Sequence, residues 1–105
     1  MEPRKTYPIE IGGVHRELPL FEVSPGLKIA ILNILGDTEL VSAAAKELTA
    51  RLDLNSFDTL VTAESKSIPL IHMLALETKK PYVVLRKQYK VYMGNAIQAE
   101  TLSIT

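Results

Sequence analysis

The chain has 105 residues, enough for one small domain with a modest core but not for two. Twelve basic and twelve acidic residues give a formal net charge of zero, which argues against a nucleic-acid or membrane-surface partner. The absence of cysteine excludes disulfides and thiol chemistry, and no apolar run approaches the ~20 residues of a membrane span, so the composition fits a cytoplasmic protein.

The first 26 residues predict an N-terminal β-hairpin. Two β-type runs, residues 7–11 and 14–23, flank Gly12 and Gly13, and paired glycines suit the tight turns of hairpins. Pro8 and Pro19 favour a position at a sheet edge, because proline has no N–H for the hydrogen-bond ladder.

The next part of the chain predicts a strand and then a helix. Residues 27–35 are strongly apolar and could form a strand or a short helix, but the isoleucines and the flanking glycines favour a strand. Asp37 or Thr38 is a good N-cap for a helix that ends near Leu52. Leucine or alanine recurs every four residues from Leu40, which gives this helix one apolar stripe.

A strand–helix–strand unit is predicted between residues 59 and 85. The strands are residues 59–63 and 82–85, and the helix runs from Ile68 to about Lys79, with Pro69 in its first turn. This helix is apolar on most sides, so we expect it to be largely buried against the sheet. The spacing is typical of a right-handed βαβ unit with parallel strands.

The predicted fold class is therefore α/β, with a mainly parallel sheet, flanking helices and a β-hairpin at each end. We treat the chain as a single domain, with an N-terminal hairpin (1–26), an α/β core (27–88) and a hood-like arm (89–105). The arm is expected to contain the C-terminal hairpin, because residues 91–93 and 96–104 flank Gly94 and Asn95.

Polar and basic residues follow both predicted parallel strands. The residues in question are Glu64, Ser65, Lys66, Ser67, Arg86, Lys87 and Lys90. Parallel strands end at the same edge of a sheet, which is where open α/β sheets bind ligands. A helix N-terminus and several cations at that edge suit a phosphorylated, anionic ligand. The alternative is a solvated loop and a solvated strand end without a ligand.

The histidines and the remaining sequence motifs give weaker evidence of a functional site. His15 is expected on the surface and His72 partly buried and hydrogen-bonded, neither of them in catalysis. No P-loop or dinucleotide-binding motif occurs, and the spacing of histidines and acidic residues does not suggest a protein-built metal site.

The order of these motifs resembles the first half of a type I phosphoribosyltransferase, most closely the adenine and xanthine branch. The resemblance runs over roughly residues 18–90 and rests on Ala-Glu64-Ser65-Lys66-Ser67, the apolar helix, and Tyr-Val-Val-Leu-Arg86-Lys87-x-x-Lys90. It implies purine salvage, in which ribose 5-phosphate passes from phosphoribosyl pyrophosphate to a purine-like base with Mg²⁺ assistance and pyrophosphate is released.

The resemblance also implies roles for these residues. The loop from Glu64 to Ser67 would hold the pyrophosphate, with a non-proline cis peptide at Glu64–Ser65 or Ser65–Lys66. Arg86, Lys87 and Lys90 would supply cations to the same diphosphate and lead into a flexible hood.

The chain departs from the family in one important respect. It contains no two adjacent acidic residues and no Thr-Gly turn of the kind that cradles the ribose 5-phosphate. We therefore expect the chain as given to bind pyrophosphate weakly without making nucleotide. A non-catalytic nucleotide-sensing or assembly domain is the second hypothesis, and a piece of a longer protein that continues beyond Thr105 is the third.

The departure also predicts association. A parallel sheet without its later strands leaves an open edge, and open edges recruit another chain. We expect a homodimer or larger assembly through that edge or through the C-terminal arm.

Overall fold

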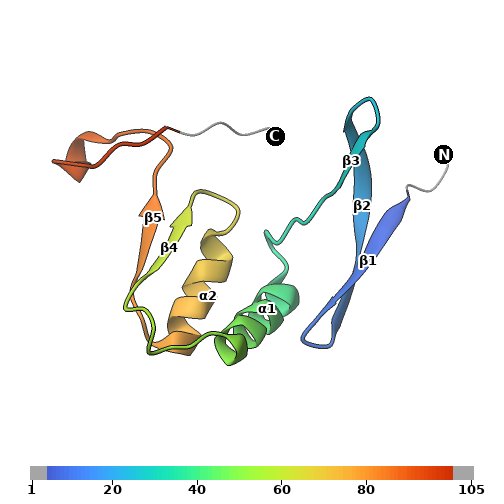
Figure 1. The fold of residues 1–105 in the computed structure, drawn as a ribbon, viewed down its shortest axis with the longest axis horizontal. Helices are drawn as coiled ribbons and strands as arrows, with labels where there is room; N and C mark the ends of the chain where they lie inside the picture. The colour runs from blue at the N-terminus through green and yellow to red at the C-terminus, as the bar shows by residue number, and fades with distance from the viewer. Residues whose placement is uncertain (1–4, 101–105) are drawn as a thin grey trace.

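The computed structural model describes residues 5–100, arranged as an elongated body with extents of 51 × 31 × 23 Å (Figure 1). Its elements follow in chain order: β1 (Thr6–Ile11), β2 (Val14–Ser24), β3 (Leu27–Ala30), α1 (Thr38–Arg51), β4 (Leu60–Ala63), α2 (Ile68–Thr78), β5 (Tyr82–Leu85) and the 3₁₀ turn η1 (Val91–Met93).

The N-terminal strands form an antiparallel sheet in the order β1-β2-β3. The predicted hairpin is confirmed, with Ile11 opposite Val14 around the glycine turn. The apolar run that follows is a strand only as far as Ala30, and it pairs with β2 rather than joining the parallel core. The Asn33 side chain then accepts a hydrogen bond from the Leu35 N–H at 3.1 Å, a local turn that ends extended structure and leads the chain into α1.

Helix α1 forms where its sequence pattern predicts. The Asp37 carboxylate accepts a hydrogen bond from the Leu40 N–H at 3.1 Å and so caps the helix. The apolar stripe is only partly buried: Leu40 is buried, whereas Leu48 is exposed.

The predicted βαβ unit is confirmed. Strands β4 and β5 are parallel, with Val61 opposite Val83 and Ala63 opposite Leu85, and α2 connects them. The helix covers one face of this pair (Figure 1). The helix was expected to be largely buried, but Leu76 is 62% exposed and its buried residues are confined to Ile71, Leu74 and Thr78.

Two expectations about the fold are not met. A mainly parallel sheet is not confirmed, because in the described chain parallel pairing is confined to β4 and β5 and the larger sheet is antiparallel. The C-terminal hairpin is wrong over its described part: Val91–Met93 is a 3₁₀ turn and residues 96–100 form no strand. Positive φ at Gly94 ends the turn, but no partner strand pairs with the residues that follow. Residues 101–104 of the expected second strand lie outside the described part.

The hydrophobic core lies where the two helices pack. Among residues 5–100, the buried apolar side chains all lie on α1 or α2: Leu40, Val41, Ala45, Ile71 and Leu74. Between residues 5 and 100, no helix has the length and apolar character that crossing a bilayer requires.

Candidate functional site

The ends of β4 and β5 bring the two polar segments together. The ladder continues past the strands, because the Glu64 N–H donates to the Leu85 carbonyl at 3.0 Å. The loop after β4 and the basic segment after β5 therefore lie at the same sheet edge, as parallel pairing predicts.

One oxygen of the Glu64 side chain joins these segments. Its Oε1 accepts hydrogen bonds from the Lys87 backbone N–H and from Arg86 Nε, both at 2.8 Å. The Lys87 N–H first, and then the Arg86 guanidinium, hold the pKa of Glu64 below its usual range. The same contact raises the pKa of Arg86, with a smaller effect from Tyr92, whose hydroxyl accepts a bond from Arg86 at 3.3 Å.

Hydrogen bonds of Ser67 hold the loop after β4 in place. Its hydroxyl donates to the Ala63 carbonyl at 2.9 Å and lies 2.6 Å from the Thr62 hydroxyl. These bonds hold the start of α2 against the end of β4. The cis peptide that the family resemblance implies is present at Glu64–Ser65. Ser67 therefore stabilises the conformation of the loop.

The remaining predicted cations extend into solvent to different degrees. Lys66 is exposed at the tip of the loop, and no ion pair within residues 5–100 involves it. Lys90 is half-buried at the start of η1, where its ammonium lies 3.5 Å from the Gln88 side-chain oxygen. The binding of an anion by these residues stays a prediction.

The described residues do not form a metal centre. No three histidine, cysteine, aspartate or glutamate side chains gather within residues 5–100. The one carboxylate at the candidate site, Glu64, is already engaged by Arg86 and Lys87.

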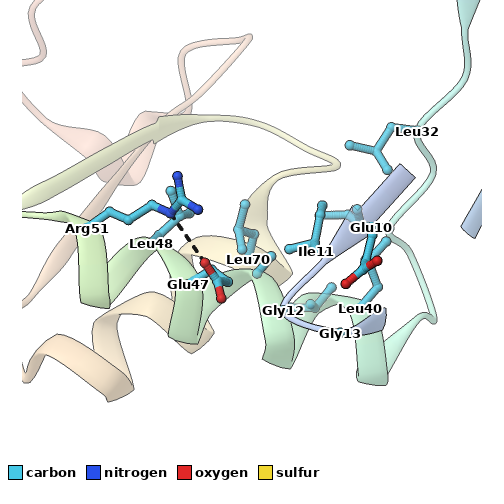
Figure 2. A pocket seen from close by; sticks show the side chains of 13 residues that line it. Glu10, Ile11, Gly12, Gly13, Leu32, Leu40, Glu47, Leu48, Arg51 and Leu70 are labelled. Carbon is cyan, nitrogen blue, oxygen red and sulfur yellow. Dashed lines mark hydrogen bonds and ion pairs between the residues drawn. The ribbon is translucent and has the colours of Figure 1, made fainter. Parts of the chain in front are cut away.

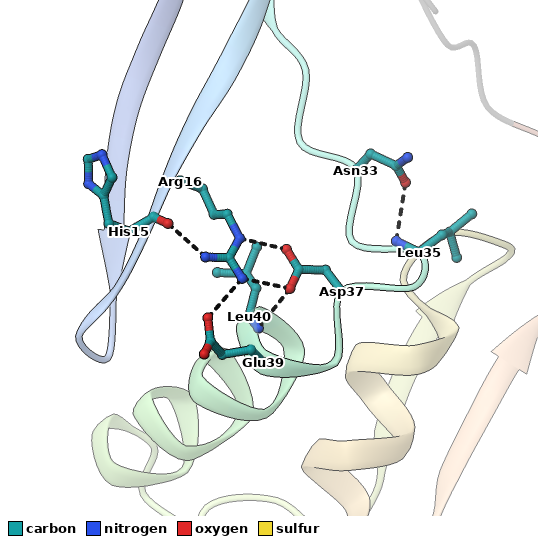
Figure 3. Close-up of polar contacts among 7 residues, drawn as sticks. All are labelled: His15, Arg16, Asn33, Leu35, Asp37, Glu39 and Leu40. Atoms are coloured by element: carbon teal, nitrogen blue, oxygen red, sulfur yellow. Dashed lines mark hydrogen bonds and ion pairs between the residues drawn. The ribbon is translucent and has the colours of Figure 1, made fainter.

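A second polar cluster was not predicted from the sequence (Figure 3). Arg16 on β2 binds Asp37 with two hydrogen bonds, at 2.8 and 2.9 Å, and reaches Glu39 at 3.0 Å. Arg16 holds the pKa of Asp37 below its usual range, with the Leu40 N–H adding to the effect. The cluster fastens the hairpin to the N-terminus of α1. The sequence indicated that Asp37 could cap the helix. It did not indicate that Arg16, 21 residues earlier, would pair with Asp37.

Two cavities border α1. The larger, about 640 Å³, lies between the hairpin turn, the apolar side of α1 and Leu70. Figure 2 shows Ile11 and Leu70 beside it, with the Glu47–Arg51 pair at one end. The smaller, about 420 Å³, lies between the starts of α1 and α2 and includes His72. Neither is lined by the loop after β4 or by the segment after β5.

The two histidines lie away from the candidate anion site. His15 is on the surface, as expected, and contacts Glu17 at 3.1 Å. His72 is hydrogen-bonded, its Nδ1 lying 3.1 Å from the Tyr82 hydroxyl, but it is exposed rather than partly buried. It lies on the side of α2 that faces Tyr82 of β5.

No family model matches the chain, whereas comparison with known proteins shows a partial similarity. A hypoxanthine/guanine phosphoribosyltransferase from Methanotorris igneus is 36% identical to the chain over 64 residues. The match covers 60% of this chain and 35% of the relative, so the chain matches only about a third of the relative's length.

Proposed function

Because the chain has a type I phosphoribosyltransferase-like relationship over part of its length, we propose that it forms the front part of such an enzyme. The complete protein would transfer ribose 5-phosphate from phosphoribosyl pyrophosphate to a purine-like base and release pyrophosphate. In this proposal the described residues hold the leaving pyrophosphate.

The observation that carries the proposal is the junction at Glu64. A single carboxylate oxygen connects the loop after β4 to Arg86 and Lys87 after β5, two segments more than 20 residues apart in sequence. The cations are thereby brought to the end of the sheet beside the start of α2, where the positive end of the helix dipole favours an anion.

The residues at this edge would have two roles, binding the diphosphate and neutralising its charge. Lys66 and the backbone of the loop would bind the diphosphate, and Arg86, Lys87 and Lys90 would neutralise the charge that grows on it as the ribosyl carbon becomes cationic. Arginine suits phosphate oxygens because its planar fork can donate two hydrogen bonds at once. Mg²⁺, when bound to the substrate's oxygens, would neutralise further charge.

Glu64 has a different role from the one that the motif implies. Its carboxylate would repel a diphosphate at close range, and its Oε1 is already used by Arg86 and Lys87. We therefore place Glu64 behind the site as a residue that positions the two cations, rather than as a ligand.

Pyrophosphate binding tests the proposal directly. Lys66→Ala and Arg86→Ala should each weaken the affinity of the chain for magnesium pyrophosphate by about tenfold or more, since each removes a charge-assisted hydrogen bond. Isothermal titration calorimetry would measure this. Lys46→Ala, which removes an exposed lysine on α1, is the matched control and should leave the affinity unchanged. An equal loss in all three variants would indicate non-specific attraction and would overturn the site.

A non-catalytic binding or assembly role is the second candidate. It is favoured by the amount of apolar surface that the described chain leaves exposed. Nucleotide binding without nucleotide formation by the complete gene product would support it over the transferase.

A further inference from the structure

The Arg86 guanidinium is held from two segments of the chain. Its Nε donates to Glu64 Oε1 at 2.8 Å, and its Nη1 donates to the Tyr92 hydroxyl at 3.3 Å. Glu64 follows β4, whereas Tyr92 lies in η1. One contact would let the planar guanidinium rotate about that contact, but two contacts on different nitrogen atoms fix its plane.

The two contacts leave the outer edge of the guanidinium available. An arginine has five N–H groups, one on Nε and two on each of Nη1 and Nη2. Glu64 and Tyr92 accept from two of them, and no residue between 5 and 100 accepts from Nη2. One N–H of Nη1 and both of Nη2 can therefore bind an anion, as the fork that donates to two phosphate oxygens at once.

Tyr92 reaches Arg86 because residues 89–94 form a closed turn. The Tyr89 hydroxyl donates to the Gly94 carbonyl, and the Gly94 N–H donates back into η1 at 3.3 Å. Gly94 ends the turn with a φ of +63°, a conformation that strains residues with a Cβ. The turn therefore holds Tyr92 in place through its own bonds, although Tyr92 is 77% exposed.

We infer that Tyr92 is a positioning residue of the candidate anion site, which orients the outer edge of Arg86 before an anion binds. The inference rests on the pyrophosphate binding proposed above. A flexible side chain loses conformational freedom when it binds a ligand, and a site that holds it in advance avoids part of that loss. The Tyr92 hydroxyl suits this role because it carries no charge and so does not repel an anion.

Tyr92→Phe tests the inference, because it removes the hydroxyl and keeps the ring. We expect it to weaken the binding of magnesium pyrophosphate to the full 105-residue chain by about three- to tenfold, the effect of one hydrogen bond. Tyr7→Phe removes the hydroxyl of an exposed tyrosine on β1, so it is the matched control and should leave the affinity unchanged. Gly94→Ala strains the turn without removing a side-chain donor, and it should weaken binding as well.

Two further measurements separate positioning from direct contact with the anion. In an Arg86→Ala background, Tyr92→Phe should have no additional effect on affinity, since Tyr92 acts through Arg86. The Arg86 Nε–H signal in a proton–nitrogen NMR spectrum needs no ligand. Tyr92→Phe should shift this signal or speed its exchange with water, because the guanidinium gains freedom, whereas Tyr7→Phe should leave it unchanged.

The failure of the inference is distinguishable from that of the proposed function. An unchanged affinity in Tyr92→Phe, with wild type still binding magnesium pyrophosphate, would overturn the inference alone. An additional loss caused by Tyr92→Phe in the Arg86→Ala background would also overturn it, since Tyr92 would then contact the anion itself. A wild-type chain that does not bind magnesium pyrophosphate would overturn the proposed function and the inference with it.

Discussion

Glu64 holds the candidate anion site together through one oxygen atom, and its effect on binding can be measured. Two influences of this carboxylate oppose each other: it repels an anion nearby, and it fixes Arg86 and Lys87 in place. The contact is direct and short, whereas the exposed surroundings screen the repulsion, so positioning should dominate.

Glu64→Ala should therefore weaken pyrophosphate binding by several-fold, although the variant removes a negative charge. Titration calorimetry in low salt, where repulsion is strongest, is the appropriate measurement. Tighter binding by Glu64→Ala would show that the carboxylate faces the ligand and that its positioning role is wrong.

Asp37 acts on stability through two bonds of different kinds. It caps α1 and it forms the ion pair with Arg16 that fastens the hairpin. Its pKa lies below the ordinary value of 3.8, so its ionised form stabilises the fold at neutral pH. That contribution is complete above pH 3.8 and is lost as the pH falls through the lower value in the folded protein.

Asp37→Asn should flatten the loss of stability in acid. Asparagine still caps a helix but carries no charge, so the variant isolates the ion pair. Urea unfolding followed between pH 2 and 7 should show a lower stability than wild type at pH 7 and a difference that shrinks as the pH falls below 3.8. Glu39→Gln, at the exposed end of the same cluster, should change the profile less. A constant difference at every pH would mean that the charge of Asp37 is immaterial.

At the scale of elements, the hairpin and α1 depend on one close approach. Gly12 has a φ of +55°, and a Cβ at this position would lie 3.2 Å from the Ala43 carbonyl oxygen and 3.2 Å from its Cβ. Any larger residue here would therefore require the turn or α1 to shift. Gly13 also has a positive φ but has open space around it.

Gly12→Ala and Gly13→Ala form a matched pair. Both should cost roughly 1–2 kcal/mol for the left-handed backbone, and Gly12→Ala should cost more, because backbone atoms of α1 have to move. Denaturant unfolding of the two variants gives the difference. Equal losses would show that the hairpin turn does not press on α1.

At the scale of the whole molecule, the body is extended and its core is small. The radius of gyration is 16.7 Å, compared with about 13 Å for a typical domain of 100 residues. Its core lies between two helices, and the antiparallel sheet touches that core mainly through the hairpin turn and the Arg16 cluster. A molecule built in this way gains much from a partner that covers its exposed apolar surface.

The sequence by itself determined the elements that depend on local patterns. Two β-type runs around Gly12-Gly13 predicted the hairpin, and an N-cap at Asp37 or Thr38 predicted the start of α1. The apolar helix between two short runs predicted the βαβ unit. From parallel pairing it also followed that the loop after β4 and the cations after β5 share one edge. These features depend on chain neighbours or on a rule that holds for all parallel strands.

Only the tertiary structure decided the features that depend on distant partners. The pairing of Leu27–Ala30 with β2, the contact of Arg16 with Asp37 and the engagement of Glu64 by Arg86 each join residues whose sequence separation carries no periodic signal. The exposure of the β4–β5 face was equally hidden, because an apolar strand has the same sequence pattern whether a second layer covers it or not. Whether a strand face is buried depends on the second layer that packs against it, and the sequence of the strand does not specify that layer.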